Sequence, residues 1–279
     1  MSLFSGAFLG GMAPRPRQPQ SEVEYLDVAG WGGAPLRTYY YRPETWTPNW
    51  PAIVVIHGAN RNLQFTLDTW LPLAQSIGFM PVIPHFTHRS FGGDKFALGG
   101  VRRGFPAERS AFRAIEPMFD ALRAETGLRR TRYSLFGHSA GAQFVERFLL
   151  FNREARAART VLSMAGWYTL PNERLPWPYG THDVAIDEGD FASLFERECS
   201  LVLGENDDDP YADQLRRSSL AKSQGRHRLE RGQHFFSVAR EFARERSLPF
   251  NWAMRILPDA KHDSRAAARA YAAWLAHRQ

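Results

Sequence analysis

Cysteine and lysine are scarce in this sequence of 279 residues, and it has no long apolar run. Cys199 is the single cysteine, so no disulfide can form within the chain, and a small fold stapled by disulfides is excluded. No stretch reaches the roughly 20 apolar residues that a membrane-spanning helix needs, and the first residues lack the basic start of a secretory signal. We therefore expect a cytoplasmic protein without a membrane span, with export left open.

The basic residues are almost all arginine: only three of the 35 are lysine, so 32 are arginine. The net charge is +6 and the isoelectric point is near 9.7. A nucleic-acid-binding protein gathers its basic residues on one face or tail. Here the arginines recur along the whole chain, often beside acids, and the densest groups, at residues 102–103 and 129–132, fit loops or helix ends as easily as a phosphate site. The sequence therefore favours a solvated, mutually paired surface and no nucleic-acid partner.

Hydrophobic residues make up 44% and charged residues 23% of the chain, which excludes a disordered protein. Beyond residue 20, short apolar runs alternate with longer segments of helical period, the pattern of a mostly parallel α/β sheet flanked by helices. We expect strands near residues 22–28, 36–41, 52–56, 80–83, 133–136, 160–164, 200–203 and 252–256, the first two forming a β-hairpin. We expect helices near residues 67–77, 107–126, 143–151 and 264–277, the second of them kinked or divided at Pro117. Residues 1–20 are expected to be a flexible lead-in to one domain spanning 21–279.

The segment Gly137-His138-Ser139-Ala140-Gly141 follows an expected strand and precedes an apolar helix. This is the context of a G-x-S-x-G nucleophile elbow, in which the serine lies on a strained turn. Glycine is needed on both sides of the serine because side chains there would collide where strand and helix cross. The pattern predicts that Ser139 is exposed at a helix N-terminus, where free amides and the helix dipole favour a developing negative charge.

A serine hydroxyl is a weak nucleophile unless a base takes its proton and an acid orients that base. Acidic residues at 205 and 207–209 follow the expected strand 200–203, and His262 follows the strand 252–256. Serine, acid and histidine in that chain order, each after the C-terminal end of a strand, resemble the α/β-hydrolase family, with its mostly parallel, eight-stranded type of sheet. The resemblance extends from about residue 22 to the end of the chain.

The resemblance implies roles for particular residues. His262 would be the general base and Asp207 the orienting acid, because Asp207 stands at the family's Gly-x-x-Asp position, with Asp208 and Asp209 as alternatives. The oxyanion would be held by the amide of Ala140, directly after the nucleophile, and by an amide from the His-Gly loop after the strand 52–56, at Ala59 or Asn60.

Four further residues are candidates for substrate contact: His138, Arg61, Trp167 and Tyr168. The two aromatic residues begin an aromatic and proline-rich segment, residues 166–198, where the family inserts a cap or lid. They either wall an apolar substrate site or cover the edge of the sheet. His85 and His88 lack the carboxylate or cysteine partners of a metal centre, so no metal and no cofactor is expected.

These features predict a serine hydrolase that cleaves carboxylic esters, small or polymeric, through an acyl-enzyme intermediate. The pattern is similar to small bacterial-type esterases and polyester depolymerase-like hydrolases. Two alternatives remain: an amidase or peptidase of the same fold, and a non-catalytic binding protein on a hydrolase scaffold. The oligomeric state stays open.

Overall fold

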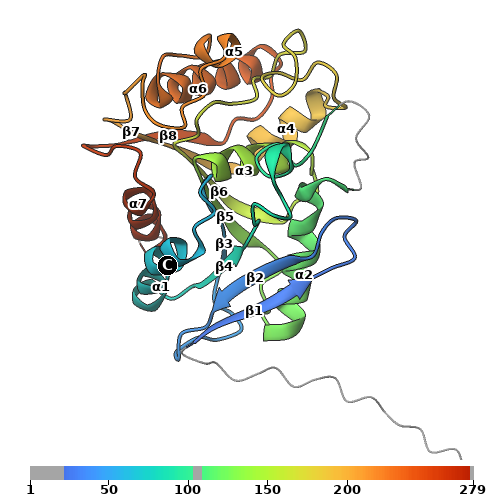
Figure 1. Ribbon diagram of the computed structural model, residues 1–279, viewed down its shortest axis with the longest axis vertical. Helices are drawn as coiled ribbons and strands as arrows, with labels where there is room; N and C mark the ends of the chain where they lie inside the picture. Colours follow the sequence, from blue (N-terminus) through green and yellow to red (C-terminus); the bar gives the residue numbers. More distant parts are fainter. Residues whose placement is uncertain (1–21, 103–108, 277–279) are drawn as a thin grey trace, which may run out of the picture.

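The computed structural model describes residues 22–102 and 109–276, so the predicted lead-in, residues 1–20, lies outside the described part of the chain. Eight strands form one sheet in the order β1-β2-β4-β3-β5-β6-β7-β8 (Figure 1). They are β1 (Val23–Val28), β2 (Leu36–Tyr41), β3 (Ala52–Ile56), β4 (Met80–Pro84), β5 (Tyr133–His138), β6 (Ala157–Ser163), β7 (Glu198–Gly204) and β8 (Trp252–Leu257). This confirms the predicted α/β class.

The first two strands form the expected antiparallel hairpin, and β2 also pairs antiparallel with β4. From β4 to β8 every pairing is parallel. Strand β3 has the predicted bounds and is buried along its whole length, as a β-branched run between two helical layers must be. Because β3 and β5 to β8 run parallel, the loops that leave their carboxyl ends meet at one edge of the sheet.

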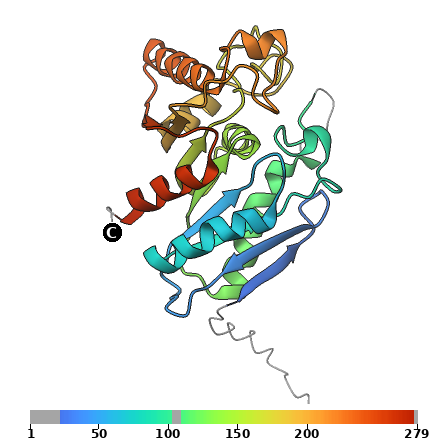
Figure 2. The same ribbon diagram turned by 60° about the vertical axis from the view of Figure 1, so that its left-hand side comes forward.

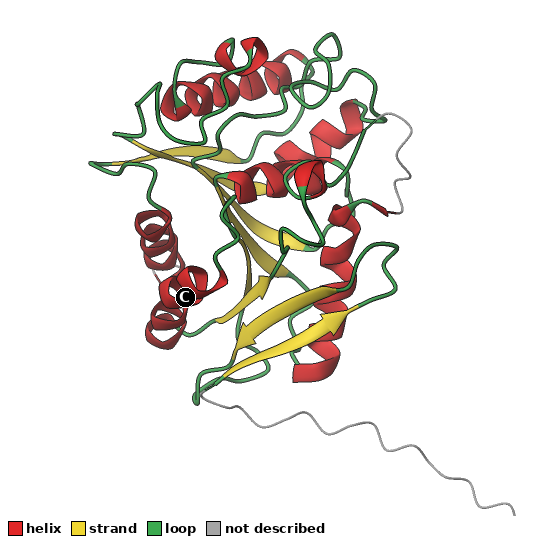
Figure 3. Ribbon diagram, viewed as in Figure 1, coloured by secondary structure: helices red, strands yellow, loops and turns green. Residues whose placement is uncertain are grey.

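Helices cover both faces of the sheet (Figure 3). On one face α1 (Leu63–Ile77) and α7 (Ser264–Ala276) lie side by side, as Figures 1 and 2 show. The other face packs against α2 (Ile115–Thr126), α3 (Ala140–Leu150), α4 (Glu188–Glu196) and α6 (Arg228–Glu245). A short helix, α5 (Ser219–Lys222), and two 3-10 turns, η1 (Gly93–Lys95) and η3 (Ala111–Ala114), complete the described elements.

Local chemistry explains where two helices begin and end. The Asn62 side chain accepts a hydrogen bond from the amide of Phe65, so α1 begins four residues earlier than the apolar period predicts. It ends at Gly78, in the left-handed conformation that glycine adopts without strain. The predicted division at Pro117 takes the form of η3 followed directly by α2, with the proline in the first turn, where its missing N–H costs nothing.

The basic residues at 226–231 do not all follow the solvated, paired surface that the sequence favours. His227 caps α6, which starts at Arg228, and the side chains of Arg228 and Arg231 are buried. The guanidinium of Arg231 donates to the carbonyls of Gly166, Arg216 and Gly225. Carbonyl groups of other loops thus accept hydrogen bonds from a buried guanidinium group. The local pattern of charged residues in the sequence does not predict such contacts.

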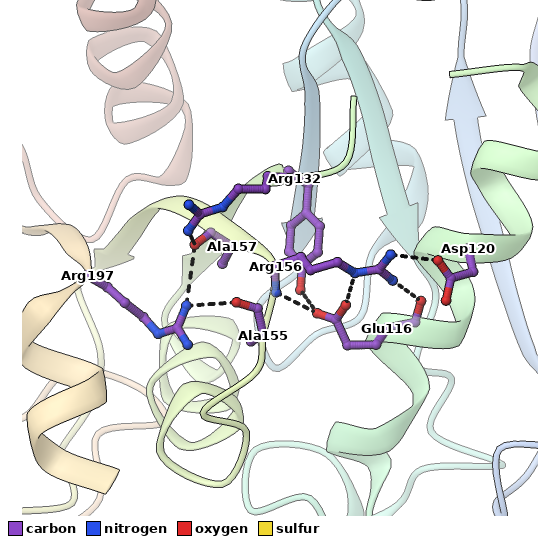
Figure 4. A network of polar contacts seen from close by, with 8 residues as sticks. Glu116, Asp120, Arg132, Ala155, Arg156, Ala157 and Arg197 are labelled. Carbon is purple, nitrogen blue, oxygen red and sulfur yellow. Dashed lines mark hydrogen bonds and ion pairs between the residues drawn. The ribbon is translucent and has the colours of Figure 1, made fainter. Parts of the chain in front are cut away.

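A polar network joins the sheet to α2 at the amino ends of the strands, the edge opposite the loops described above (Figure 4). The Glu116 carboxylate accepts from the Tyr133 hydroxyl at 2.5 Å and from Arg156 Nε at 2.5 Å. Arg156 Nη1 also donates to Asp120 at 2.6 Å. The paired acids and arginines here fit the predicted pairing of charges.

Residues 166–198 run from the end of β6 through an irregular segment into α4. Trp167 and Tyr179 pack together at a ring distance of 4.6 Å, and Tyr168 stacks on Phe235 at 4.4 Å. All four of these aromatic side chains are buried. The segment therefore packs against other parts of the fold, Tyr168 against α6 and Trp167 and Tyr179 against Ala221 of α5, and its predicted action as a cap stays a prediction.

Candidate active site

Ser139 lies at the junction of β5 and α3 with backbone angles φ 55° and ψ −118°. This is a strained conformation for a residue with a side chain, and the glycines on either side make it possible. A Cβ at Gly137 would come within 2.4 Å of the Gly141 carbonyl oxygen, and one at Gly141 within 2.2 Å of the Ile56 oxygen. The elbow expected from the sequence is therefore present, with steric reasons for both glycines.

The backbone around Ser139 is arranged to hold a negative charge. The Ser139 amide donates to the Ser163 carbonyl at 2.8 Å, which ties the turn to β6. Ala140 is the first residue of α3, and the first amides of a helix have no partner within it. Its N–H is therefore available for an anion, with the helix dipole behind it.

His262 and Asp207 are joined by a hydrogen bond of 2.8 Å between Nδ1 and Oδ2. Asp207 is only 5% exposed, whereas Asp208 and Asp209 are exposed. The structure thus brings Asp207, of the three candidate acids, to the histidine. The contact leaves Nε2 of His262 free to exchange a proton with a hydroxyl.

Ser139 and His262 line one cleft of about 280 Å³. It lies at the carboxyl ends of β3 and β5, between the loop after β3 and the starts of α1 and α7. Within the described residues the two side chains share the cleft without a direct hydrogen bond.

The loop after β3 places Ala59 and Asn60 in the same cleft. Gly58 brings it close to Ser139, since a Cβ added there would lie 3.8 Å from Ser139 Cβ. A turn closes the loop, with the Arg61 amide donating to the Gly58 carbonyl at 3.1 Å. Both candidate oxyanion amides therefore stand on a short, tied loop beside Ser139.

Arg61, also in the cleft wall, fixes this loop to its neighbour. Its Nη1 donates to the Phe86 carbonyl at 2.7 Å and to the Phe91 carbonyl at 3.2 Å, and its guanidinium lies 4.1 Å from the centre of the Phe96 ring. Burial lowers the pKa of Arg61 to about 10, so the charge persists at neutral pH. The contacts give Arg61 a role in holding the loop, and its contact with substrate stays a prediction.

Two buried histidines flank the cleft. The ring of His138 lies 4.7 Å from that of His262, and its Nδ1 is 3.1 Å from Ser163 Oγ. Burial holds the pKa of His138 well below its usual range, and burial lowers the pKa of His57 to about 3. Both rings are therefore neutral at neutral pH, so they shape the site without adding charge.

The aromatic walls of the cleft differ from those expected. Phe65, Trp70 and Phe136 line it, whereas Trp167 and Tyr168 do not. Trp167 packs under the guanidinium of Arg147 at 4.3 Å, and Tyr168 is fully buried. Both predicted substrate aromatics are thus packing residues in this structure. The sequence signal for the actual wall was the apolar face of α1, which directly follows the loop carrying Asn60.

Sequence reasoning also missed a buried cation. Arg228, the first residue of α6, donates from Nη1 to Oδ1 of Asp207 over 3.3 Å.

The described part of the chain holds no group of three or more His, Cys, Asp or Glu residues suited to a metal ion. Nor does any helix in that part have the length and apolarity to cross a membrane.

Two solved structures match nearly the whole chain. Poly(aspartic acid) hydrolase-1 from Sphingomonas sp. KT-1 is 33% identical, with a TM-score of 0.87 over 93% of this chain and 99% of its own. LpqC, a poly(3-hydroxybutyrate) depolymerase from Bordetella parapertussis, is 27% identical, with a TM-score of 0.85 over 93% and 92%. The S-formylglutathione hydrolase FrmB from Staphylococcus aureus, 14% identical with a TM-score of 0.56 over 95% and 100%, shares the fold alone. No protein-family model and no curated protein matches the chain.

The sheet order, the elbow and the position of the cleft define an α/β-hydrolase fold, and the 33% identity extends that likeness to sequence. The chain therefore belongs to the α/β-hydrolase superfamily. Its solved neighbours there include hydrolases, esterases and a depolymerase, which supports activity as a hydrolase.

Proposed function

We propose that the protein is a serine hydrolase that cleaves carboxylic esters, with Ser139 as nucleophile, His262 as general base and Asp207 as orienting acid. One observation carries the proposal. A serine on a strained elbow shares a cleft with a histidine whose Nδ1 lies 2.8 Å from a buried carboxylate. This arrangement supports the assignment of a base and an orienting acid to the hydroxyl.

In the first half of the reaction Ser139 Oγ attacks the ester carbonyl carbon while its proton passes to His262 Nε2. The carbonyl oxygen becomes an oxyanion and accepts hydrogen bonds from the amides of Ala140 and of Ala59 or Asn60. The bond to the alcohol oxygen then breaks, and the alcohol leaves with the proton from His262. Water attacks the acyl-enzyme by the same route and releases the acid and free Ser139.

The cleft favours a short acyl group. Its volume of about 280 Å³ is at the lower end for ligand pockets, and Phe65, Trp70 and Phe136 give it an apolar wall. LpqC is described as acting on poly(3-hydroxybutyrate), a polyester of a four-carbon acid. We therefore propose esters of short-chain acids, free or in a polymer, as substrates.

Amide hydrolysis is the second candidate, and one observation favours it. The relative at 33% identity is described as a hydrolase of poly(aspartic acid), whose units are joined by amide bonds. The same nucleophile, base and oxyanion amides would act on either bond. Turnover of p-nitrophenyl butyrate against the matched butyryl p-nitroanilide separates the two, and soluble poly(aspartic acid) and poly(3-hydroxybutyrate) granules extend the test to polymers.

The experiment compares the wild type with Ser139→Ala and with Ser76→Ala, an exposed serine on α1. We expect Ser139→Ala to abolish turnover and labelling by a fluorophosphonate, with the label on Ser139 in the wild type by mass spectrometry. Ser76→Ala should match the wild type. Turnover retained by Ser139→Ala would refute the proposal, and a folded wild type with neither turnover nor label would favour the non-catalytic binding protein.

A further inference from the structure

The acid of the proposed triad has a second partner on the side away from His262. Asp207 Oδ2 faces the histidine, and Oδ1 faces Nη1 of Arg228 at 3.3 Å. The side chains of Asp207 and Arg228 are each 5% exposed. The carboxylate therefore sits between an imidazole and a guanidinium, largely out of water.

The side chain of Arg228 is held by contacts with residues near Asp207. Its Nη2 donates to the Asp213 carbonyl at 3.0 Å, in the loop that continues from the acid, and its Nε is buried without a partner among the described residues. The Leu229 amide donates to the Asp207 carbonyl at 3.2 Å, so the start of α6 also holds the acid's backbone. Burial of a guanidinium with one unmet donor is costly. That cost is consistent with a functional requirement.

A buried carboxylate needs a compensating charge, and a neutral His262 supplies a hydrogen bond but no charge. Arg228 supplies the charge, and its contact with Oδ1 fixes the plane of the carboxylate so that Oδ2 points at Nδ1. We propose that Arg228 is a positioning residue of the hydrolase, acting on catalysis through Asp207. This inference rests on the proposed function.

The charged and titratable groups around the pair come from four elements. His262 belongs to the loop after β8, and the neutral His138 ends β5. Tyr168 lies in the segment after β6, and Arg231 is on α6 with Arg228. Without the cation of Arg228, the carboxylate would hold a proton on His262 more strongly. Activity should then require a higher pH, because the base must be neutral to accept the serine proton.

The test measures kcat and KM for p-nitrophenyl butyrate from pH 5 to 9 in the wild type, Arg228→Met and Arg228→Lys. For Arg228→Met we expect kcat to fall about 100-fold, as when a catalytic group is misplaced by about 1 Å, with KM little changed and the acid limb of the profile moved to higher pH. Arg228→Lys should restore the acid limb and part of kcat. The matched control is Arg226→Met, an exposed arginine two residues away that pairs with Glu230, and its profile should overlay the wild type.

A double-mutant cycle separates positioning from a general effect on structure. Because Arg228 acts through Asp207, Arg228→Met should lower kcat little further in an Asp207→Asn background. If Arg228→Met alone fails to fold, the double variant can still be measured, because Asp207→Asn removes the buried charge that would be left unpaired. The proposal is overturned if Arg228→Met keeps the wild-type kcat and pH profile, or if the losses in the cycle are fully additive. Ser139→Ala is measured in parallel: turnover that survives it refutes the proposed function, whereas a Ser139-dependent enzyme indifferent to Arg228 refutes only the positioning role.

Discussion

Replacing Gly141 by alanine tests whether the elbow is held by close backbone contact. An added Cβ would lie 2.2 Å from the Ile56 carbonyl oxygen and 2.6 Å from the His57 oxygen. Both obstacles are backbone atoms of β3 and of the loop that carries the candidate oxyanion amides. They cannot rotate away as a side chain can, so α3 and this loop must separate by roughly 1 Å to reach ordinary contact.

Two magnitudes follow for Gly141→Ala. Forcing one extra carbon into a packed site costs about 1–3 kcal/mol, and we expect the upper end, about 3 kcal/mol, because the strain falls on backbone. A displacement of about 1 Å between Ser139 and the loop of the candidate oxyanion amides should lower kcat about 100-fold. Urea denaturation followed by circular dichroism gives the first quantity, and ester turnover gives the second.

Gly166→Ala is the matched control. A Cβ there would meet Gln143 Nε2 at 3.6 Å, an ordinary contact, so stability and kcat should stay close to the wild type. If Gly141→Ala matches Gly166→Ala in both measurements, Gly141 is not sterically required and close backbone contact does not hold this side of the elbow.

Three further predictions concern other parts of the molecule. Gln214→Ala removes a hydrogen bond of 3.0 Å from Gln214 to Asn60 across the cleft, so kcat/KM should fall roughly fivefold, the worth of about 1 kcal/mol, and Asn60→Ala should show the same loss without adding to it. Burial raises the pKa of Glu146 from 4.5 to about 7, so the stability that its protonated form contributes is full below about pH 4.5 and is lost as pH rises through 7. Urea titrations should therefore show the stability of the wild type, relative to Glu146→Gln, falling by about 2–3 kcal/mol between pH 5 and 8, and a difference that does not change with pH would contradict this. Glu116→Gln weakens the network with Arg156 at the opposite edge of the sheet, so it should cost about 1–2 kcal/mol in urea denaturation and leave kcat unchanged; a large loss of kcat would contradict the separation of the two edges.

The parts of the fold that could be predicted from sequence are those dictated by neighbouring residues. The short β-branched run Ala52–Ile56 favours a buried strand, and the structure has it with the same bounds. The glycine spacing around Ser139 restricts the chain to one kind of turn. The order of acid and histidine after their strands places Asp207 and His262 at the same edge, because parallel strands end there together.

Long-range contacts account for what could not be predicted. Segment 226–231 has four arginine or glutamate residues, and its pattern is typical of a solvated surface. Two of its arginines are buried nonetheless, because loops more than ten residues away supply their acceptors. The residues of the cleft wall could not be predicted for the same reason, because they too depend on long-range contacts. The apolar face of α1 was visible in the sequence, but only the packing of α1 beside α7 and the loop of Asn60 turns Phe65 and Trp70 toward Ser139.

Three of the arginines of this lysine-poor chain hold loops around the candidate site. A guanidinium offers five donors in a planar fork, so one arginine can bind several carbonyls at fixed angles, whereas an ammonium is a compact charge on a flexible stem. Arg61 binds two carbonyls beside the loop after β3, and Arg231 binds the carbonyls of Gly166, Arg216 and Gly225. Arg228 joins the Asp213 carbonyl to the Asp207 carboxylate. In each case the arginine is buried or half-buried and its acceptors come from loops that carry or flank the site. These arginine side chains thus point into the protein, where their guanidinium groups bind carbonyls of loops that lack the regular hydrogen bonds of helices and strands. Lysine could not make the same contacts, so replacing these arginines by lysine would leave the loops around the cleft less ordered.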